Sequence, residues 1–280
     1  MSRATAFGAA TGAAAAVAGL ALWSLWHEPR NVRLRRLAIS PPRWPRALDG
    51  LTVAVVSDLH TGAPHVDARR VERIVERLDR ESPDMVALLG DYADPEVALG
   101  HRVEPSEVAR LLGRLRAPLG RFAVLGNHDW HAHGSAMPRA LRAEGITVLE
   151  NDALPVEAGS APLWVAGLAD ATTRTPRLDE TLAVVPADAT VLLLSHHPDL
   201  FPHAPARVSL TLAGHTHGAQ VDLPVVRDKV TPSKHGARYT SGHQVEDGRH
   251  LFVSPGVGTS RFAIRFRARP EITLLRLDAE

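Results

Sequence analysis

From Leu51 onward the chain repeats one pattern: a short apolar run, a polar cluster that contains Asp, His or Asn, and then an amphipathic segment. Residues 51–56 (LTVAVV) run into Ser57-Asp58-Leu59-His60, and residues 85–89 (MVALL) end at Gly90-Asp91. Such alternation is typical of an α/β protein that carries its functional groups at strand ends. It predicts a layered fold with polar chemistry along a sheet edge.

Three further apolar runs end in the same way, at residues 126–129 (GNHD), 195–198 (SHHP) and 214–218 (GHTHG). Helices are expected after Asp67 and from Pro105, where apolar residues recur at helical spacing. The runs at 146–150, 154–158 and 163–168 are expected to form successive antiparallel strands, and those at 251–254 and 271–277 to be the last strands.

Composition excludes several classes of function. A chain of 280 residues with 45% hydrophobic composition can bury a substantial core. The absence of cysteine excludes a thiolate nucleophile, a cysteine zinc site and a disulfide. The net charge of only +1 gives no reason to expect a specific nucleic-acid partner.

The amino-terminal segment is expected to lie outside the fold. Residues 7–26 form an uncharged stretch of 20 residues, and a helix of that length spans about 30 Å, the thickness of a bilayer core. We therefore predict a membrane anchor over residues 1–29 and a single-pass protein of the cell membrane. A cleaved signal peptide and a soluble, Ala-rich helix are the alternatives.

Arginines follow the stretch more than they precede it, which by the positive-inside rule favours a cytoplasmic catalytic domain, although the side of the membrane stays open. Residues 30–50, with three prolines, are expected to be an extended linker, and residues 51–280 the catalytic domain.

The polar clusters supply residue types that bind metal ions. Loops beyond the strand ends of an α/β sheet lie along one edge, so these groups can converge. Carboxylate, imidazole and amide ligands suit Mn²⁺, Fe²⁺ or Zn²⁺ and are poor for Ca²⁺. Seven ligands are too many for one tetrahedral ion but suit two ions that share a carboxylate. The candidate ligands are Asp58, His60, Asp91, Asn127, His196, His215 and His217.

Each motif alone is weak evidence, because Asp-x-His is usually a solvated strand end and Gly-Asp a common turn. Their occurrence together, each after an apolar run, favours a site. The combination SDLH, GD, GNHD, SHHP and GHTHG resembles the calcineurin-like metallophosphoesterase family from Leu51 to the carboxyl end. The bacterial, membrane-associated YkuE/YaeI-like branch is similar in Glu28-Pro29, in residues 233–242 and in residues 256–272.

The resemblance implies an α/β fold, a four-layer β-sandwich flanked by helices. It implies that one ion is held by Asp58, His60 and His217, that the other is held by Asn127, His196 and His215, and that Asp91 bridges them. His128 would be the catalytic, non-ligand histidine near the leaving group, oriented by Asp58 or Asp129. His197 competes with His196 as a ligand, whereas His131 and His133 have no role in the family.

The predicted function is hydrolysis of phosphomono- or phosphodiesters by a metal-bridged hydroxide. One alternative is a membrane-associated pyrophosphatase that acts on a lipid-linked or nucleotide-sugar phosphate. Another is a non-catalytic, metal-binding scaffold. The sequence does not indicate the natural substrate, the oligomeric state or which of the metals is used.

Overall fold

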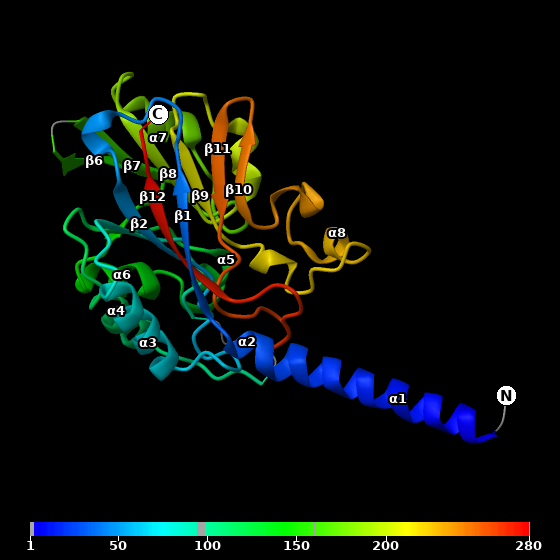
Figure 1. The fold of residues 1–280 in the computed structure, drawn as a ribbon. Helices are drawn as coiled ribbons and strands as arrows, with labels where there is room; N and C mark the ends of the chain where they lie inside the picture. Colours follow the sequence, from blue (N-terminus) through cyan, green and yellow to red (C-terminus); the bar gives the residue numbers. More distant parts are fainter. Residues whose placement is uncertain (1–2, 94–98, 160, 280) are drawn as a thin grey trace.

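Two six-stranded mixed sheets form the body of the protein (Figure 1). The computed structural model describes residues 3–93, 99–159 and 161–279, and side chains from Thr11 onward. The strands of the first sheet, in spatial order, are β1 (Arg33–Ile39), β12 (Glu271–Leu277), β2 (Leu51–Val56), β3 (Met85–Leu88), β4 (Arg121–Ala123) and β5 (Thr147–Val148). Those of the second are β10 (Gly242–Glu246), β11 (Arg249–Val253), β9 (Leu210–Ala213), β8 (Thr190–Ser195), β7 (Ala161–Gly167) and β6 (Asp152–Ala158).

Most neighbouring strands are parallel, and three pairs are antiparallel: β12 with β2, β6 with β7, and β10 with β11. The antiparallel pairing expected for residues 154–158 and 163–168 is therefore confirmed. The expectation that residues 146–150 continue that series is wrong, because β5 pairs in parallel with β4 in the other sheet.

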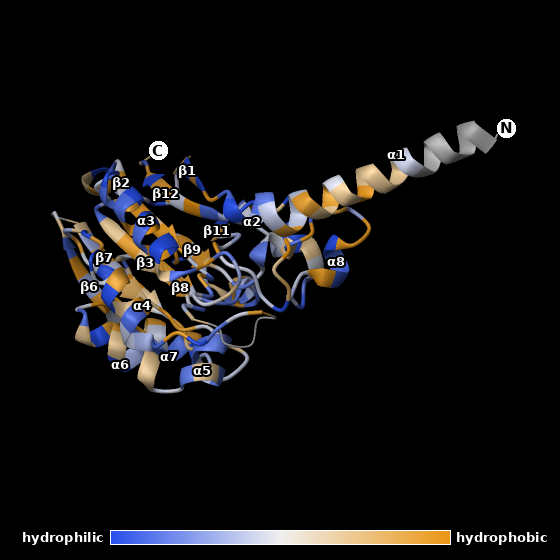
Figure 2. Cartoon of the chain, turned by 90° about the horizontal axis from the view of Figure 1, so that it is seen from below, coloured by the Kyte–Doolittle hydropathy of each residue, from blue (hydrophilic) through white to orange (hydrophobic). Residues whose placement is uncertain are grey.

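Three buried apolar clusters hold the layers together. One lies between the first sheet and the helices α3 (Ala68–Asp79), α4 (Pro105–Leu112) and α6 (Ala136–Ala143), a second lies between the two sheets, and a third covers the outer face of the second sheet. Helix α7 (Leu178–Ala183) and the turn η3 (Pro198–His203) contribute to the third. In Figure 2 the hydrophobic colour is concentrated in inner strands such as β3, β8 and β9. The chain thus has the expected α/β architecture.

The local sequence explains where the helices begin. Asp67 caps α3 by accepting a hydrogen bond from the amide of Arg70, and Pro105 occupies the first turn of α4. The remaining helical segments are short: α5 (Asn127–His133), α8 (Arg227–Val230), η2 (Arg46–Leu48), η4 (His217–Ala219) and η5 (Gly236–Tyr239).

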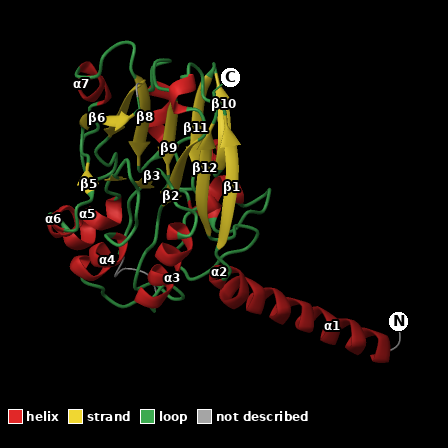
Figure 3. Cartoon of the chain, turned by 60° about the vertical axis from the view of Figure 1, so that its left-hand side comes forward, coloured by secondary structure: helices red, strands yellow, loops and turns green. Residues whose placement is uncertain are grey.

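The amino-terminal segment is helical, in α1 (Arg3–Leu22), the π-helical turn η1 (Trp23–His27) and α2 (Glu28–Arg30). Helix α1 extends away from the two sheets (Figure 3). In the part of the chain that the structure describes, no helix combines the length and the apolar character needed to cross a membrane. The predicted transmembrane helix is therefore not supported, because alanine and glycine make up much of this stretch and contribute little to insertion.

The junction after this helix is held to the body by Glu28. Its carboxylate accepts hydrogen bonds from the indole of Trp23 and from the amide of Ala268, both at 2.8 Å. The segment predicted as a linker also contains β1, which pairs in parallel with β12. Its sequence, RLRRLAI, is too rich in arginine to be recognised as a strand. The arginines are accommodated because β1 lies at the edge of the sheet, where Arg33 pairs with Glu271 at 2.6 Å.

Candidate metal centre

Register within the first sheet brings two polar clusters together. Val56 of β2 lies opposite Leu88 of β3, so both strands end at the same edge of the sheet. The loops then continue side by side, with the amide of Asp58 bonded to the carbonyl of Gly90 and the amide of His60 bonded to the carbonyl of Asp91, each at 2.9 Å. Convergence of these carboxylates follows from parallel strand pairing.

The second sheet repeats this arrangement. Ser195 of β8 lies opposite Ala213 of β9, and the amide of Gly214 donates to the carbonyl of His196 at 3.0 Å. The amide of His215 in turn donates to the carboxylate of Asp58 at 3.1 Å. The polar ends of the two sheets therefore meet.

Side chains from both sheets form a first cluster of buried ligand atoms. Nε2 of His60 and Nε2 of His217 lie 3.1 Å apart, and Nε2 of His217 lies 3.4 Å from Oδ1 of Asp58. These three residues can direct their ligand atoms at one ion. Ser57 donates a hydrogen bond to Asp58 and orients its carboxylate.

A second cluster lies beside the first. Nε2 of His196 is 3.2 Å from Nδ1 of His215, while Nδ1 of His196 bonds to the carbonyl of Leu89 at 2.6 Å. That bond places the proton on Nδ1 and leaves Nε2 as a ligand atom. Oδ2 of Asp91 is 3.3 Å from Nε2 of His196 and 3.6 Å from Nε2 of His60, so it lies between the clusters.

Asn127 and His128 reach the same place from the start of α5. The amide of His128 donates to Oδ1 of Asp91 at 3.0 Å, and the His128 and His60 rings lie 5.0 Å apart. Oδ1 of Asn127 is buried and has no hydrogen-bond partner among the described residues. A buried amide oxygen without a donor is costly unless a cation satisfies it.

The backbone is strained at five of the seven candidate ligands. Asp58, His60, Asp91, His215 and His217 have φ values from 45° to 69°, the left-handed region that residues with a Cβ rarely adopt. Such conformations persist where the surrounding structure enforces them, and they cluster at functional sites.

Charges within the cluster shift the pKa values of its members. Burial alone would raise the pKa of Asp91, but the neighbouring His196 outweighs it and holds that pKa well below its usual range. Burial would likewise lower the pKa of His196, yet Asp91 raises it to about 10. Burial, followed by repulsion from His60, lowers the pKa of His217 well below its usual range. A neutral His217 is a competent metal ligand, whereas a metal ion has to displace the proton from Nε2 of His196.

The clusters open into a cavity of about 440 Å³. Asp91, Asn127, His128, His215 and His217 line it, as do Lys229, Arg261 and Phe262. The structure thus brings all eight predicted site residues together. Neither His131 nor His133 lines this cavity.

His197 also lies beside the second cluster, with its ring 3.7 Å from that of His215. Its Nε2 is 2.9 Å from Oδ1 of Asp170 and 3.0 Å from the hydroxyl of Thr172. Sequence analysis missed Asp170, although Asp170 follows the apolar run of β7 just as the predicted ligands follow theirs. The repeated pattern could have found it.

The residues present fit a pair of metal ions. Nitrogen atoms of four imidazoles converge in pairs at 3.1 and 3.2 Å, carboxylates lie against both pairs, and the orphaned oxygen of Asn127 adds a hard donor. Three groups of described residues could each hold an ion: Asp58 with His60 and His217, Asp58 with Asp91 and His196, and His196 with His197 and His215. Asp58 belongs to two of these groups, and so does His196. Borderline divalent ions prefer this mixed nitrogen and oxygen donor set.

Comparison with known proteins agrees with the geometry. Residues 51–219, more than half of the chain, match the family described as Calcineurin-like phosphoesterase. The chain is 30% identical over 277 residues to the uncharacterized metallophosphoesterase YkuE of Bacillus subtilis, covering 98% of this chain and 95% of that protein. It is 30% identical over 206 residues to phosphodiesterase YaeI of Escherichia coli, covering 70% and 71%.

A further relative, UDP-2,3-diacylglucosamine pyrophosphatase LpxG of Chlamydia trachomatis, is 26% identical over 312 residues, covering 91% of this chain and 92% of that protein. All the predicted ligands, from Asp58 to His217, lie within the matched residues 51–219. The chain belongs to the calcineurin-like phosphoesterases and is a metal-dependent phosphoester hydrolase with a binuclear centre.

Proposed function

We propose that Asp58, His60 and His217 hold one ion, that Asn127, His196 and His215 hold the other, and that Asp91 bridges them. The position of Asp91 carries this assignment, because its Oδ2 lies 3.6 Å from a ligand nitrogen of the first set and 3.3 Å from one of the second. His197 is assigned a positioning role, since its Nε2 already contacts Asp170 and Thr172.

Manganese, iron and zinc are the ions that the donor set favours. When bound, such ions polarise phosphoryl oxygens and lower the pKa of a coordinated water. The chain itself would position the ester and deliver a proton to the leaving oxygen. His128 is suited to that proton transfer because it lines the cavity and its backbone amide is fixed on Asp91.

The proposed activity is hydrolysis of phosphomono- or phosphodiesters. Its test is reconstitution of the purified, metal-stripped chain with Mn²⁺, Fe²⁺ or Zn²⁺, followed by assay on nitrophenyl phosphate and bis-nitrophenyl phosphate with metal analysis of the same samples. Turnover that rises with the second equivalent of metal is expected. Saturation of both rate and binding at one equivalent would overturn the assignment of two sites.

A second candidate is cleavage of a lipid-linked pyrophosphate. The cavity carries exposed apolar groups, because Phe262 and Val230 are 68% and 43% exposed and both line it. LpxG, a relative over nearly the whole chain, is named as a pyrophosphatase of a diacylated nucleotide sugar. The test is hydrolysis of such a substrate in liposomes by Phe262→Ser. A rate at least tenfold below that of the wild type, with an unchanged rate on bis-nitrophenyl phosphate, would favour this candidate.

A further inference from the structure

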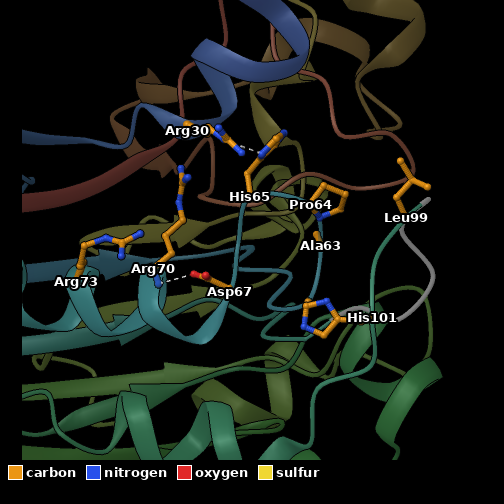
Figure 4. Close-up of a pocket in the computed structure, with 10 residues that line it drawn as sticks. Arg30, Ala63, Pro64, His65, Asp67, Arg70, Arg73, Leu99 and His101 are labelled. Atoms are coloured by element: carbon orange, nitrogen blue, oxygen red, sulfur yellow. Dashed lines mark hydrogen bonds between the residues drawn. The ribbon is translucent and has the colours of Figure 1, made fainter.

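A second cavity, of about 440 Å³, lies between the end of the amino-terminal helical segment and the start of α3 (Figure 4). Its lining shares no residue with that of the metal cavity. Three arginines line it: Arg30 from α2, and Arg70 and Arg73 from α3. An adjoining cavity of about 410 Å³ includes the same three arginines and one carboxylate, Glu76, and continues past Arg77 to Arg80 just after α3.

The charges in this pocket are not balanced. Asp67 is the one carboxylate in its lining, and its Oδ1 accepts the amide hydrogen of Arg70 at 2.8 Å as the cap of α3. Among the ion pairs of the described residues, none involves Arg30, Arg70 or Arg73. Three guanidinium groups around one cavity create a positive field that attracts anions.

Arg70 is the buried member of this group, with only 6% of its surface exposed. Its Nη2 donates to the carbonyl of Pro29 at 2.5 Å, and its Nε has no hydrogen-bond partner within the described ranges. Burial, followed by repulsion from Arg73, lowers the pKa of Arg70 to about 10. A buried guanidinium with an unused donor is stabilised by an anion that reaches it.

The guanidinium of Arg30 is also fixed in position beside this pocket. It lies over the ring of Trp26 at 3.0 Å, and its Nε donates to Nδ1 of His65 at 3.1 Å. His65 can accept that bond because its Nε2 donates to the carbonyl of Leu25 at 2.8 Å. Figure 4 shows Arg70 pointing from α3 toward Arg30 and His65. The planar guanidinium fork matches the oxygens of a phosphate group.

Exposed apolar side chains lie in the turn that leads to Arg30, and one of them, Trp26, contacts both Arg30 and His65. Trp23, Leu25 and Trp26 are 48%, 50% and 55% exposed, and His27, Glu28 and Pro29 separate them from Arg30 in the sequence. Exposed tryptophans beside arginines are typical of surfaces that lie in the headgroup region of a bilayer. Binding of a soluble phosphate would require the arginines but not these exposed apolar side chains.

We propose that the pocket formed by Arg30, Arg70 and Arg73 binds the phosphate of an anionic lipid headgroup while Trp23, Leu25 and Trp26 enter the interface. The chain then docks on an anionic lipid surface through this face, independently of a membrane-spanning segment and of the metal centre.

Co-sedimentation of the full chain with lipid vesicles tests this proposal. Vesicles of phosphatidylcholine alone are compared with vesicles that contain phosphatidylglycerol. The pocket variant is Arg30→Gln with Arg73→Gln, because both side chains are exposed, whereas Arg70 is buried. The matched control is Arg69→Gln with Arg110→Gln, two exposed arginines outside both basic cavities that remove the same charge.

Each arginine near an anionic surface is worth about fivefold in partitioning, so the pocket variant, which lacks two, is expected to bind anionic vesicles roughly 25-fold more weakly. The control should change by no more than about threefold, since its charges lie outside the pocket and are screened. Hydrolysis of a soluble nitrophenyl ester should be the same in all three proteins, which separates this proposal from the metal centre.

Two results would overturn the proposal. Equal losses of vesicle binding in the pocket and control variants would show that the effect comes from net charge alone. Binding of inorganic phosphate that requires Arg30 and Arg73, without any preference for anionic vesicles, would assign the pocket to a soluble anion instead of a lipid surface.

Discussion

The carboxylate of Asp129 accepts a hydrogen bond from the backbone amide of Asp91 at 2.8 Å. It also accepts from the amides of Tyr92 and Gly126, each at 2.9 Å. Asp129 is fully buried, and burial, with Asp91 nearby, raises its pKa to about 7. One side chain therefore ties the loop after β3 to the loop after β4 and fixes the backbone that carries the proposed bridging carboxylate.

Asp129→Asn should weaken this tie, because an amide offers one acceptor oxygen where the carboxylate offers two. We expect a loss of about 2 kcal/mol in the free energy of unfolding, measured by urea titration, together with weaker metal binding. Asp188→Asn, at an exposed position, is the control. Unchanged metal affinity in Asp129→Asn would show that the tie does not position Asp91.

Gly126→Ala should disturb the same region by overlap. The backbone of Gly126 is ordinary, with φ −97°, but a Cβ there would lie 2.1 Å from Oδ1 of Asp91 and 2.7 Å from Cε1 of His196. Overpacking of this kind costs about 1–3 kcal/mol. Thermal unfolding and metal analysis should both report a loss.

The control for this substitution is Gly19→Ala in α1, where no atom lies within 4 Å of the added Cβ. That variant should keep full metal content. Two full equivalents of metal in Gly126→Ala would show that the loop after β4 can shift away from Asp91 and His196, which contradicts tight packing at this position.

Arg265→Gln should be among the most destabilising substitutions in the chain. The guanidinium of Arg265 is fully buried and donates to carbonyls of Pro255, Gly258 and Ala268 at 2.5 to 3.0 Å, and more weakly to that of His217. Breaking a buried charged network costs about 3–5 kcal/mol. Arg267→Gln, exposed and two residues away, should unfold at the wild-type urea concentration; a shared midpoint for the two variants would contradict this role.

The strand ends that deliver the metal ligands were predictable because of burial. β2, β3, β8 and β9 are almost entirely buried, so their sequences are nearly continuous apolar runs whose ends are easily found. Parallel pairing then brings their ends to one edge. The predicted residues meet for that reason, and the fold class follows from the same pattern.

Other features depend on tertiary partners that local sequence does not encode. Arg265 looks like a surface residue until the carbonyls around it are known. The arginines of β1 are stabilised by Glu271 and Glu81 from distant segments, so the strand looked like a linker. The α1 segment has the length of a membrane span, but length alone does not provide the apolar character that insertion requires.

Asp91→Asn tests the bridging assignment directly. Its Oδ2 lies near Nε2 of both His60 and His196, and a neutral amide is a poor substitute for a carboxylate between two cations. Metal analysis should find fewer than two equivalents, with hydrolysis of bis-nitrophenyl phosphate reduced at least 100-fold, as roughly expected when a group acting in the transition state is lost. Retention of two equivalents would refute the bridge.

His128→Ala tests the proposed proton donor, which lines the metal cavity and is held by its amide on Asp91. An alkyl ester has a basic leaving oxygen that needs a proton, so its rate should fall by about 10²–10⁴-fold. A nitrophenyl ester releases a weakly basic oxygen and should lose far less. His131→Ala, exposed on the same helix and outside the cavity, should keep wild-type rates with both. Equal losses for the two esters in His128→Ala would instead indicate that the His128 side chain stabilises phosphoryl charge, because that role does not depend on the basicity of the leaving group.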